Sequence, residues 1–241
     1  MSRIAVFGAT GLTGGLVVEQ ALALGHEVVA LVRDPGRMAL KHPGLVVMGG
    51  SPTSARDVEL CISGTDAVIH CLGIGGKGDG KPTTLISDSV KVVLAAMRQQ
   101  GVPRILCMSN IGAGGSGTWV ANRIFIPLFL RWLLPIIDDK DRMEEALRAS
   151  AVEWVSVRLP NILEGPEKPV RVSADGRGIG FTITAASAAR FLLEQVKASD
   201  CPSSNHLRLL CALSNGVSGP SVVEVKLRFG DASSGDAGWF C

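Results

Sequence analysis

The sequence contains no tyrosine, and aromatic residues make up only 5% of its 241 residues. No phenolic hydroxyl is therefore available as a proton donor. Charged residues are also scarce at 19%, and 24 basic and 22 acidic residues leave a net charge of +2. The sequence has no long basic run, so it does not favour a nucleic-acid-binding surface, which needs clustered lysine and arginine to neutralise phosphates.

The six cysteines form neither a Cys-x-x-Cys pair nor a spacing typical of metal ligands. We expect buried, reduced thiols and no metal centre. The longest apolar stretch, residues 124–137, is interrupted by two prolines and Arg131 and falls short of the roughly 20 residues that span a bilayer. The apolar run near the N-terminus stops at Gly8 and is too short for a signal peptide. These features predict a cytoplasmic protein without a membrane span.

Short apolar runs rich in valine and isoleucine alternate with longer helix-like segments through the first two hundred residues. This alternation is typical of an α/β fold with a doubly wound parallel sheet, the Rossmann fold. The expected strands span residues 4–7, 27–32, 45–48, 67–71, 104–108 and 154–158, and the expected helices residues 13–24, 55–62, 85–100, 138–150 and 185–197.

The composition changes beyond residue 199, where an apolar run at residues 207–213 is followed by stretches rich in glycine and serine. We therefore expect a single Rossmann domain over residues 1–199 and a C-terminal appendage, poorly ordered or an edge hairpin, over residues 200–241. The oligomeric state stays open between a monomer and a homodimer.

The strongest functional signal is the turn Gly8-Ala9-Thr10-Gly11-Leu12-Thr13-Gly14, between the first expected strand and the first expected helix. Backbone NH groups at such a helix start can face a pyrophosphate with no side chain in the way. Gly8 permits the tight turn, Gly11 the close approach of the ligand, and Gly14 the packing of helix on strand. The turn predicts a dinucleotide site; the alternative is a strand-to-helix turn that binds nothing.

The second expected strand ends at Val32-Arg33-Asp34, about 20 residues past the glycines, where the adenosine ribose is expected. The guanidinium of Arg33 can grip a 2′-phosphate with two donors, and Arg37 can add a second positive charge. Asp34 can instead serve the ribose, as the acid of an NAD site does. The local chemistry favours NADPH over NADH as the cofactor.

These motifs, together with Cys107-Met108-Ser109-Asn110 after the fifth strand, resemble those of the atypical short-chain dehydrogenases/reductases. Within that group the chain is most similar, over about residues 3–198, to the NAD(P)H-binding, NmrA-like and biliverdin reductase B (flavin reductase) proteins. The resemblance implies hydride transfer from NADPH to a flavin, a tetrapyrrole, a quinone or a small carbonyl or enone. It leaves two alternatives: a non-catalytic dinucleotide sensor that controls a partner protein, and an isomerase or epimerase that retains its nucleotide.

The resemblance also implies roles for individual residues. The cofactor-binding positions fall on Gly8, Thr10, Gly11, Leu12 and Thr13 at the phosphates, Arg33 and Arg37 at the 2′-phosphate, Leu72 and Gly73 near the adenosine, Ser109 beside the nicotinamide, and Pro160, Asn161 and Ile162 around its amide. Three features depart from the family. Asn161 replaces the histidine of the biliverdin reductase B pattern, and Gly50 replaces an aspartate that usually lies beside the adenine. The absence of tyrosine rules out the YxxxK pair of ordinary short-chain dehydrogenases.

Proton delivery must then come from other groups, and we expect Ser109 and Lys140 to be the catalytic residues. Lys140 stands where isoflavone-reductase-like relatives carry a functional lysine, and burial would lower its pKa toward usefulness. The alternative is a solvated helix charge paired with Glu144 at i+4. Ser109 can polarise an acceptor oxygen, or it can be a turn serine. His70, among apolar neighbours, is expected to be a core residue.

A glycine-rich stretch at residues 112–117 leads into the apolar run at residues 124–134. Glycine hinges beside an apolar surface suit a lid over a small, largely hydrophobic substrate. A core or dimer helix explains the same residues.

Overall fold

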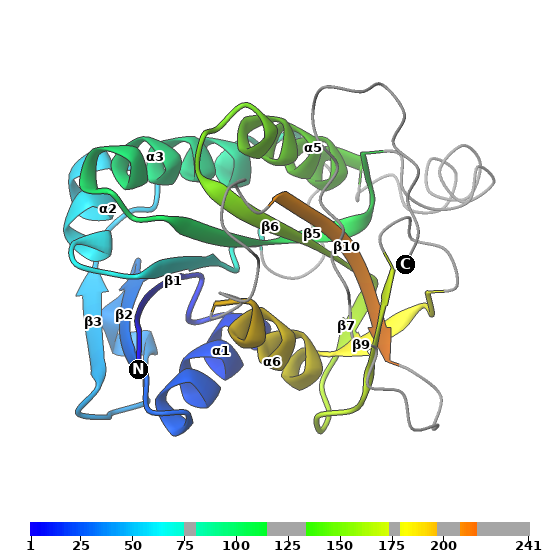
Figure 1. Ribbon diagram of the computed structural model, residues 1–241, viewed down its shortest axis with the longest axis horizontal. Helices are drawn as coiled ribbons and strands as arrows, with labels where there is room; N and C mark the ends of the chain where they lie inside the picture. The colour runs from blue at the N-terminus through cyan, green and yellow to red at the C-terminus, as the bar shows by residue number, and fades with distance from the viewer. Residues whose placement is uncertain (75–80, 115–133, 174–178, 197–207, 216–241) are drawn as a thin grey trace, which may run out of the picture.

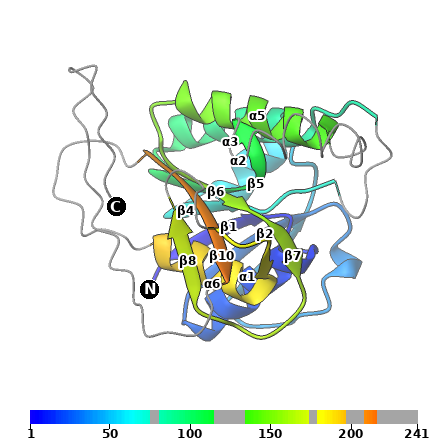
Figure 2. The same cartoon turned by 90° about the vertical axis from the view of Figure 1, so that its right-hand side faces the viewer.

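A computed structural model of the chain describes residues 1–74, 81–114, 134–173, 179–196 and 208–215. An eight-stranded sheet forms its centre, with helices on both faces (Figures 1 and 2). The strand order is β3-β2-β1-β4-β5-β6-β10-β8, and every neighbouring pair is parallel except β10 with β8. The predicted Rossmann-type, doubly wound parallel sheet is confirmed.

The elements of the main sheet and its helices follow the expected alternation. The strands are β1 (Arg3–Phe7), β2 (Glu27–Val32), β3 (Leu45–Gly49), β4 (Ala67–His70), β5 (Arg104–Gly114), β6 (Glu153–Leu159), β8 (Val170–Ser173) and β10 (Arg208–Asn215). The helices are α1 (Leu12–Ala23), α2 (Ala55–Ile62), α3 (Leu85–Gln100), α5 (Leu134–Arg148) and α6 (Ala185–Val196), with a short 3-10 helix η1 (Pro35–Arg37). A separate parallel pair is formed by β7 (Asn161–Leu163) and β9 (Thr182–Thr184).

Two hydrophobic cores hold the layers together, one on each face of the sheet. Ile4 and Val6 of β1 face the core formed with α1 and α6, whereas Ala5 and Phe7 face the core formed with α2, α3 and α5. All four side chains are fully buried. Successive side chains of a strand point to opposite faces, so strands enclosed between two helix layers must be apolar on both.

β10 lies inside the main sheet, although the sequence predicts an appendage for residues 200–241. It runs parallel to β6, with Leu209 opposite Val155 and Cys211 opposite Val157, and antiparallel to β8. A short apolar run whose partners lie far away in the sequence carries no local sign of that pairing. The division at residue 199 stays a prediction, because residues 197–207 and 216–241 lie outside the described part.

Two further elements differ from the expected bounds. α5 begins at Leu134 rather than at residue 138, since Pro135 fits the first turn of a helix, where no NH donor is needed. β5 continues to Gly114, past Met108. Residues 115–133, which carry most of the proposed lid, lie outside the described residues. In the ranges that are described, no helix combines the length and apolar character needed to cross a membrane.

Candidate functional site

The turn between β1 and α1 lies at the carboxyl edge of the sheet and needs glycine at two positions. Gly8 has a left-handed φ of +82°, and a Cβ on it would lie 2.7 Å from the carbonyl oxygen of Cys71. A Cβ on Gly14 would overlap the carbonyl oxygen of Gly8. A side chain at Gly8 would therefore separate the turn from the chain that leaves β4, and a side chain at Gly14 would push the start of α1 away from the turn.

The N-terminus of α1 has no side-chain cap. Gly11 is the N-cap residue, and the first turn contains no acidic side chain. Thr10, Gly11 and Leu12 are exposed, whereas Thr13 is buried. The turn follows β1, which lies between β2 and β4, the point where the strand order reverses. An uncapped helix start at this point of an open α/β sheet presents backbone NH groups and a positive dipole end to an anion.

Two arginines lie on the protein surface beyond the end of β2. Arg33 and Arg37 are exposed, and neither forms an ion pair with a described residue. Asp34, which is also exposed, bonds back to its own chain: its Oδ1 accepts a hydrogen bond of 3.0 Å from the NH of Gly36 and caps η1. The guanidiniums of Arg33 and Arg37 thus remain accessible after β2, and Asp34 between them is held by its bond to Gly36.

Lys140 is buried beneath the ends of β4 and β5, with 3% of its surface exposed. Its Nζ donates to the carbonyl oxygen of Leu72 at 3.2 Å and to that of Met108 at 2.5 Å. Burial lowers the pKa of Lys140 to about 8, partly against the effect of nearby acidic groups. Lys140 is therefore not the solvated helix charge that the i+4 spacing to Glu144 allowed.

Ser109 lies in β5 opposite Arg158 of β6, and only 1% of it is exposed. Its Oγ lies beside the carboxylate of Glu144 but makes no hydrogen bond of good geometry with any described residue. Since β5 continues beyond it, Ser109 is not the strand-ending serine that the sequence suggests. A buried hydroxyl without a full set of partners remains able to donate to a ligand oxygen.

Glu144, fully buried on α5, is the centre of a polar cluster that sequence reasoning missed. Its Oε1 accepts from Ser156 Oγ at 3.1 Å and from Arg158 Nε at 3.0 Å. Its Oε2 accepts from the guanidiniums of Arg158 at 2.6 Å and Arg148 at 2.9 Å. Burial alone would raise the pKa of Glu144, but the hydrogen bonds and charge of Arg158 outweigh it and hold that pKa below its usual range.

Asp139 also has a role that its own helix does not reveal. It is fully buried, and its carboxylate accepts from the backbone NH groups of Ile86 at 2.9 Å and Ser87 at 3.1 Å. It thereby caps the N-terminus of α3, where Thr84 provides no side-chain cap. From the sequence alone, Asp139 stands in the first turn of its own expected helix, residues 138–150, and nothing local signals a contact to another helix.

The remaining predicted residues lie at the ends of β4 and β6. Leu72 is half-buried and Gly73 is exposed, directly beyond the contact with Gly8. Asn161 is exposed, and its NH donates to the carbonyl oxygen of Phe181 at 3.2 Å; Pro160 and Ile162 beside it are half-buried. The expected loop around the nicotinamide amide is therefore held partly as strand β7.

His70 is a core residue, as expected. It is fully buried in β4, and its Nε2 lies 2.5 Å from Ser89 Oγ of α3. Burial, with a further effect from the charge of Lys140, lowers the pKa of His70 to about 3, so the imidazole stays neutral.

The fold brings most of the predicted residues to one edge. The turn after β1, Arg33 after β2 and Gly73 after β4 all follow carboxyl ends of parallel strands, as Asn161 does after β6. Such ends share one edge of a sheet, where open α/β folds bind ligands. The side chain of Lys140, on α5, reaches the same edge from one face of the sheet. Among the residues that the structure describes, no cluster of three or more histidine, cysteine or acidic side chains could hold a metal ion.

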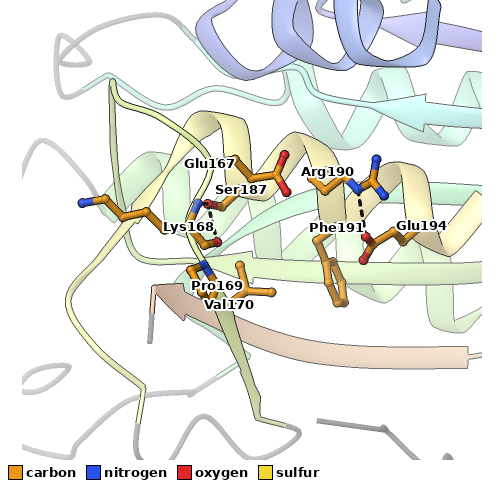
Figure 3. A pocket seen from close by; sticks show the side chains of 8 residues that line it. All are labelled: Glu167, Lys168, Pro169, Val170, Ser187, Arg190, Phe191 and Glu194. Carbon is orange, nitrogen blue, oxygen red and sulfur yellow. Dashed lines mark hydrogen bonds and ion pairs between the residues drawn. The ribbon is translucent and has the colours of Figure 1, made fainter. Parts of the chain in front are cut away.

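Two hollows in the described surface contain none of the predicted residues. One, of about 350 Å³, lies between residues 167–170 and α6, and Figure 3 shows Arg190 paired with Glu194 along it. The other, of about 640 Å³, lies between the C-terminal parts of α3 and α5. Both are remote in the sequence from the turn that follows β1.

Comparison with known proteins gives a family match over most of the chain. The sequence profile of a family described as NAD(P)H-binding matches residues 8–199. The photosystem II assembly factor Ycf39 of Synechocystis sp. is 38% identical over 174 residues, covering 68% of this chain and 46% of that protein. An uncharacterised protein of Mycobacterium tuberculosis is 28% identical over 156 residues, covering 65% and 14%. A 3-beta-hydroxysteroid dehydrogenase of Mycolicibacterium neoaurum is 32% identical over 131 residues, covering 51% and 36%. The matches thus span less than half the length of each of these relatives.

Solved structures share the fold at low sequence identity. A short-chain dehydrogenase/reductase from Veillonella parvula in complex with NADP aligns with a TM-score of 0.72 and 15% identity, covering 89% of this chain and 94% of that one. A putative NAD-dependent epimerase/dehydratase from Bacillus halodurans aligns with a TM-score of 0.73 and 19% identity, covering 90% and 95%.

Proposed function

The chain belongs to the NAD(P)H-binding family, and we propose that it is a reductase that transfers a hydride from NADPH to a small, largely apolar acceptor. The observation that carries the proposal is the uncapped N-terminus of α1: Gly14 lets it pack closely on the turn, and Gly8 lets the turn lie against the end of β4. Backbone NH groups in this position suit the diphosphate of a dinucleotide. Thr10, Gly11, Leu12 and Thr13 complete the proposed phosphate-binding turn.

The 2′-phosphate of NADPH is assigned to Arg33 and Arg37. Both guanidiniums are exposed, and the one acid beside them, Asp34, is engaged in capping η1. A ribose hydroxyl would share the carboxylate of Asp34 with the NH of Gly36, whereas a phosphate would meet two cations that form no ion pair with a described residue. One structural relative binds NADP, which is consistent with this preference.

The reacting end of the site is assigned to the ends of β4, β5 and β6. When bound, the cofactor supplies the hydride, and the protein orients the reactants and excludes water. Pro160, Asn161 and Ile162 are proposed to hold the nicotinamide amide, with Leu72 and Gly73 nearer the adenosine. Ser109 Oγ is proposed to donate to the oxygen of the acceptor, which can be a flavin, a tetrapyrrole, a quinone, or a carbonyl or enone compound.

The contacts of Lys140 favour a positioning role. Its ammonium group joins the carbonyl oxygens of Leu72 and Met108, and Met108 immediately precedes Ser109. A cation in this place fixes the spacing of the β4 and β5 ends and adds positive charge beneath the acceptor. Direct proton delivery, the role predicted from the sequence, would require Nζ to leave one of these carbonyls.

A turnover assay tests the proposed reaction. Purified protein mixed with NADPH and, in turn, flavins, biliverdin, quinones and small enones is expected to consume NADPH steadily with at least one class, followed at 340 nm. Gly8→Val is the matched negative control, because its Cβ would collide with the carbonyl oxygen of Cys71 and open the turn. Tight binding of NADPH without turnover of any acceptor would contradict the reductase.

A non-catalytic NAD(P)H sensor is the second candidate. The burial of Ser109 and the bonding of Lys140 to main-chain oxygens favour it, since both leave the expected proton donors covered. Binding without turnover would support the sensor. A nucleotide-retaining isomerase or epimerase would instead convert its substrate with no net loss of NADPH.

Replacing Lys140 with methionine is expected to lower kcat by about 10- to 100-fold while changing the Kd for NADPH by less than about threefold. Methionine keeps the length of the side chain but cannot bond the two carbonyl oxygens. Since the pKa of Lys140 is lowered to about 8, its charge is lost as pH rises through that value, and the rate of the wild-type protein is expected to fall there.

The rate of Lys140→Met should not fall as pH rises through about 8. A purely structural role of Lys140 would not predict this difference between the two pH profiles. Lys91→Met, at an exposed lysine of α3, is the control and should behave as wild type. An unchanged kcat in Lys140→Met would contradict the positioning role.

A further inference from the structure

The hydrogen-bonding capacity of the Glu144 carboxylate is fully used. Ser156 Oγ and Arg158 Nε donate to Oε1 at 3.1 and 3.0 Å, and the guanidiniums of Arg158 and Arg148 donate to Oε2 at 2.6 and 2.9 Å. An ionised carboxylate has about four acceptor positions, so these four donors fill them. Glu144 has therefore no acceptor position left for another hydroxyl.

The hydroxyl of Ser109 lies beside this carboxylate without bonding to it. Ser109 is opposite Arg158 in the register of β5 and β6, so the two side chains lie on the same face of the sheet, and Arg158 is bonded to Glu144 there. Ser109 Oγ is buried and has no hydrogen-bond partner among the described residues. A buried hydroxyl is stabilised by donating to a neighbouring carboxylate, and the full occupancy of Glu144 explains why this one does not.

Among the donors to Glu144, Ser156 is the one that water cannot replace. The side chain of Arg148 is 47% exposed, and Arg158 is held by bonds to both carboxylate oxygens. Ser156 is fully buried in β6 and contributes a single hydroxyl. Without that hydroxyl, Oε1 would have an open acceptor position in the cluster that contains the unpaired hydroxyl of Ser109.

We propose that Ser156 is a positioning residue of the reductase. By filling an acceptor position of Glu144, it leaves the hydroxyl of Ser109 free to donate to the oxygen of the hydride acceptor. The inference rests on the proposed function of Ser109. A serine has one proton to donate, so a Ser109 bonded to Glu144 would present only lone pairs to that oxygen. Ser156 itself acts through Glu144 and Ser109, without contact to the reactants.

Turnover of NADPH in a double-mutant cycle tests the proposal. Ser156→Ala is expected to lower kcat about tenfold, because the vacated position on Oε1 captures the proton of Ser109. The Kd for NADPH should change by less than about threefold. In Ser109→Ala, which has no proton to capture, the addition of Ser156→Ala should change kcat by less than about threefold. A merely structural role of Ser156 would lower kcat equally in both backgrounds.

Urea unfolding provides a second readout that does not depend on turnover. Ser109→Ala removes an unpaired buried hydroxyl from the wild-type protein, so the urea midpoint should stay unchanged or rise. In the Ser156→Ala background the same replacement removes a hydrogen bond to Glu144, and the midpoint should fall. This reversal of sign is the signature of a hydroxyl that Ser156 keeps unpaired.

Ser87→Ala is the matched control. Ser87 is also fully buried, but its Oγ donates to the carbonyl oxygen of Thr84 at 3.2 Å, at the start of α3. This variant should keep the wild-type kcat and the wild-type response to Ser109→Ala. Should Ser156→Ala not fold, Ser156→Cys decides in its place, because a thiol is close to the hydroxyl in size but is a weak donor.

Each outcome decides the proposal. An unchanged kcat in Ser156→Ala, or equal losses with and without the hydroxyl of Ser109, would overturn it while leaving the reductase intact. A fall of the urea midpoint on Ser109→Ala in the wild-type protein would show that this hydroxyl is already bonded, and would overturn it as well. Absence of turnover by the wild-type protein with every hydride acceptor would remove the proposed function and the role of Ser156 with it.

Discussion

Replacing Arg33 with alanine is expected to weaken NADPH binding by about 10- to 100-fold and to change NADH binding by less than about threefold. The guanidinium would lose charge-assisted hydrogen bonds to the 2′-phosphate, a group that NADH lacks. Arg33 is exposed and forms no ion pair with a described residue, so its removal should leave the fold undisturbed. Calorimetry with both nucleotides measures the two effects.

Two companion variants separate the geometry of Arg33 from its charge. Arg33→Lys should give an intermediate loss, since an ammonium keeps the charge but not the paired donors. Arg98→Ala, at an exposed arginine of α3, should bind both nucleotides as wild type. The difference between NADPH and NADH should shrink as salt is added, because exposed charges are screened. Comparable losses for NADPH and NADH in Arg33→Ala would contradict the phosphate assignment.

Replacing Glu144 with glutamine is expected to lower the free energy of unfolding by about 3–5 kcal/mol, the cost of breaking a buried ion pair from one side. The side chain of Arg158 is only 8% exposed and would keep its charge without a counterion. Urea unfolding followed by circular dichroism measures the loss. Arg148→Ala is the matched control, because the side chain of Arg148 is 47% exposed and its pairing with the same carboxylate should contribute less than about 1 kcal/mol.

The same carboxylate predicts a pH dependence. The pKa of Glu144 in the folded protein lies below its ordinary value of 4.5, so the folded state favours the ionised form. Its contribution is fully present above pH 4.5 and is lost as pH falls through the folded pKa. Glu144→Gln should therefore lose less stability than wild type below pH 4.5. Parallel pH profiles for the two proteins would show that Glu144 is not responsible.

The features that could be predicted from the sequence are those encoded by neighbouring residues. β1, with Ile4 and Val6 toward one helix layer and Phe7 toward the other, is apolar throughout because both faces are buried. The turn from Gly8 to Gly14 follows β1 directly, so its position between strand and helix can be predicted from the sequence alone. These local signals were sufficient for the Rossmann fold.

The features that could not be predicted depend on contacts between distant segments. Asp139 caps α3 through the NH of Ile86, 53 residues earlier, and a helical pattern contains no sign of such a partner. Lys140 has the same spacing to Glu144 as a surface ion pair, yet the packing of α5 on the sheet buries both side chains. Asp57 lies three residues after Ser54, a spacing typical of a helix cap. This local pattern gives no sign that Asp57 also lies beside Gly50.

The place of β10 has a consequence for the biosynthesis of the protein. Strands β6 and β8 are translated before Arg208–Asn215, yet β10 pairs with both of them. Until that segment has left the ribosome, the nascent chain presents the backbone of β6 along an unpaired edge, where other chains can attach. β8 pairs only with β10 among the described strands, so its final hydrogen bonds must form late in synthesis. The growing polypeptide therefore keeps an aggregation-prone strand edge until its last described strand emerges.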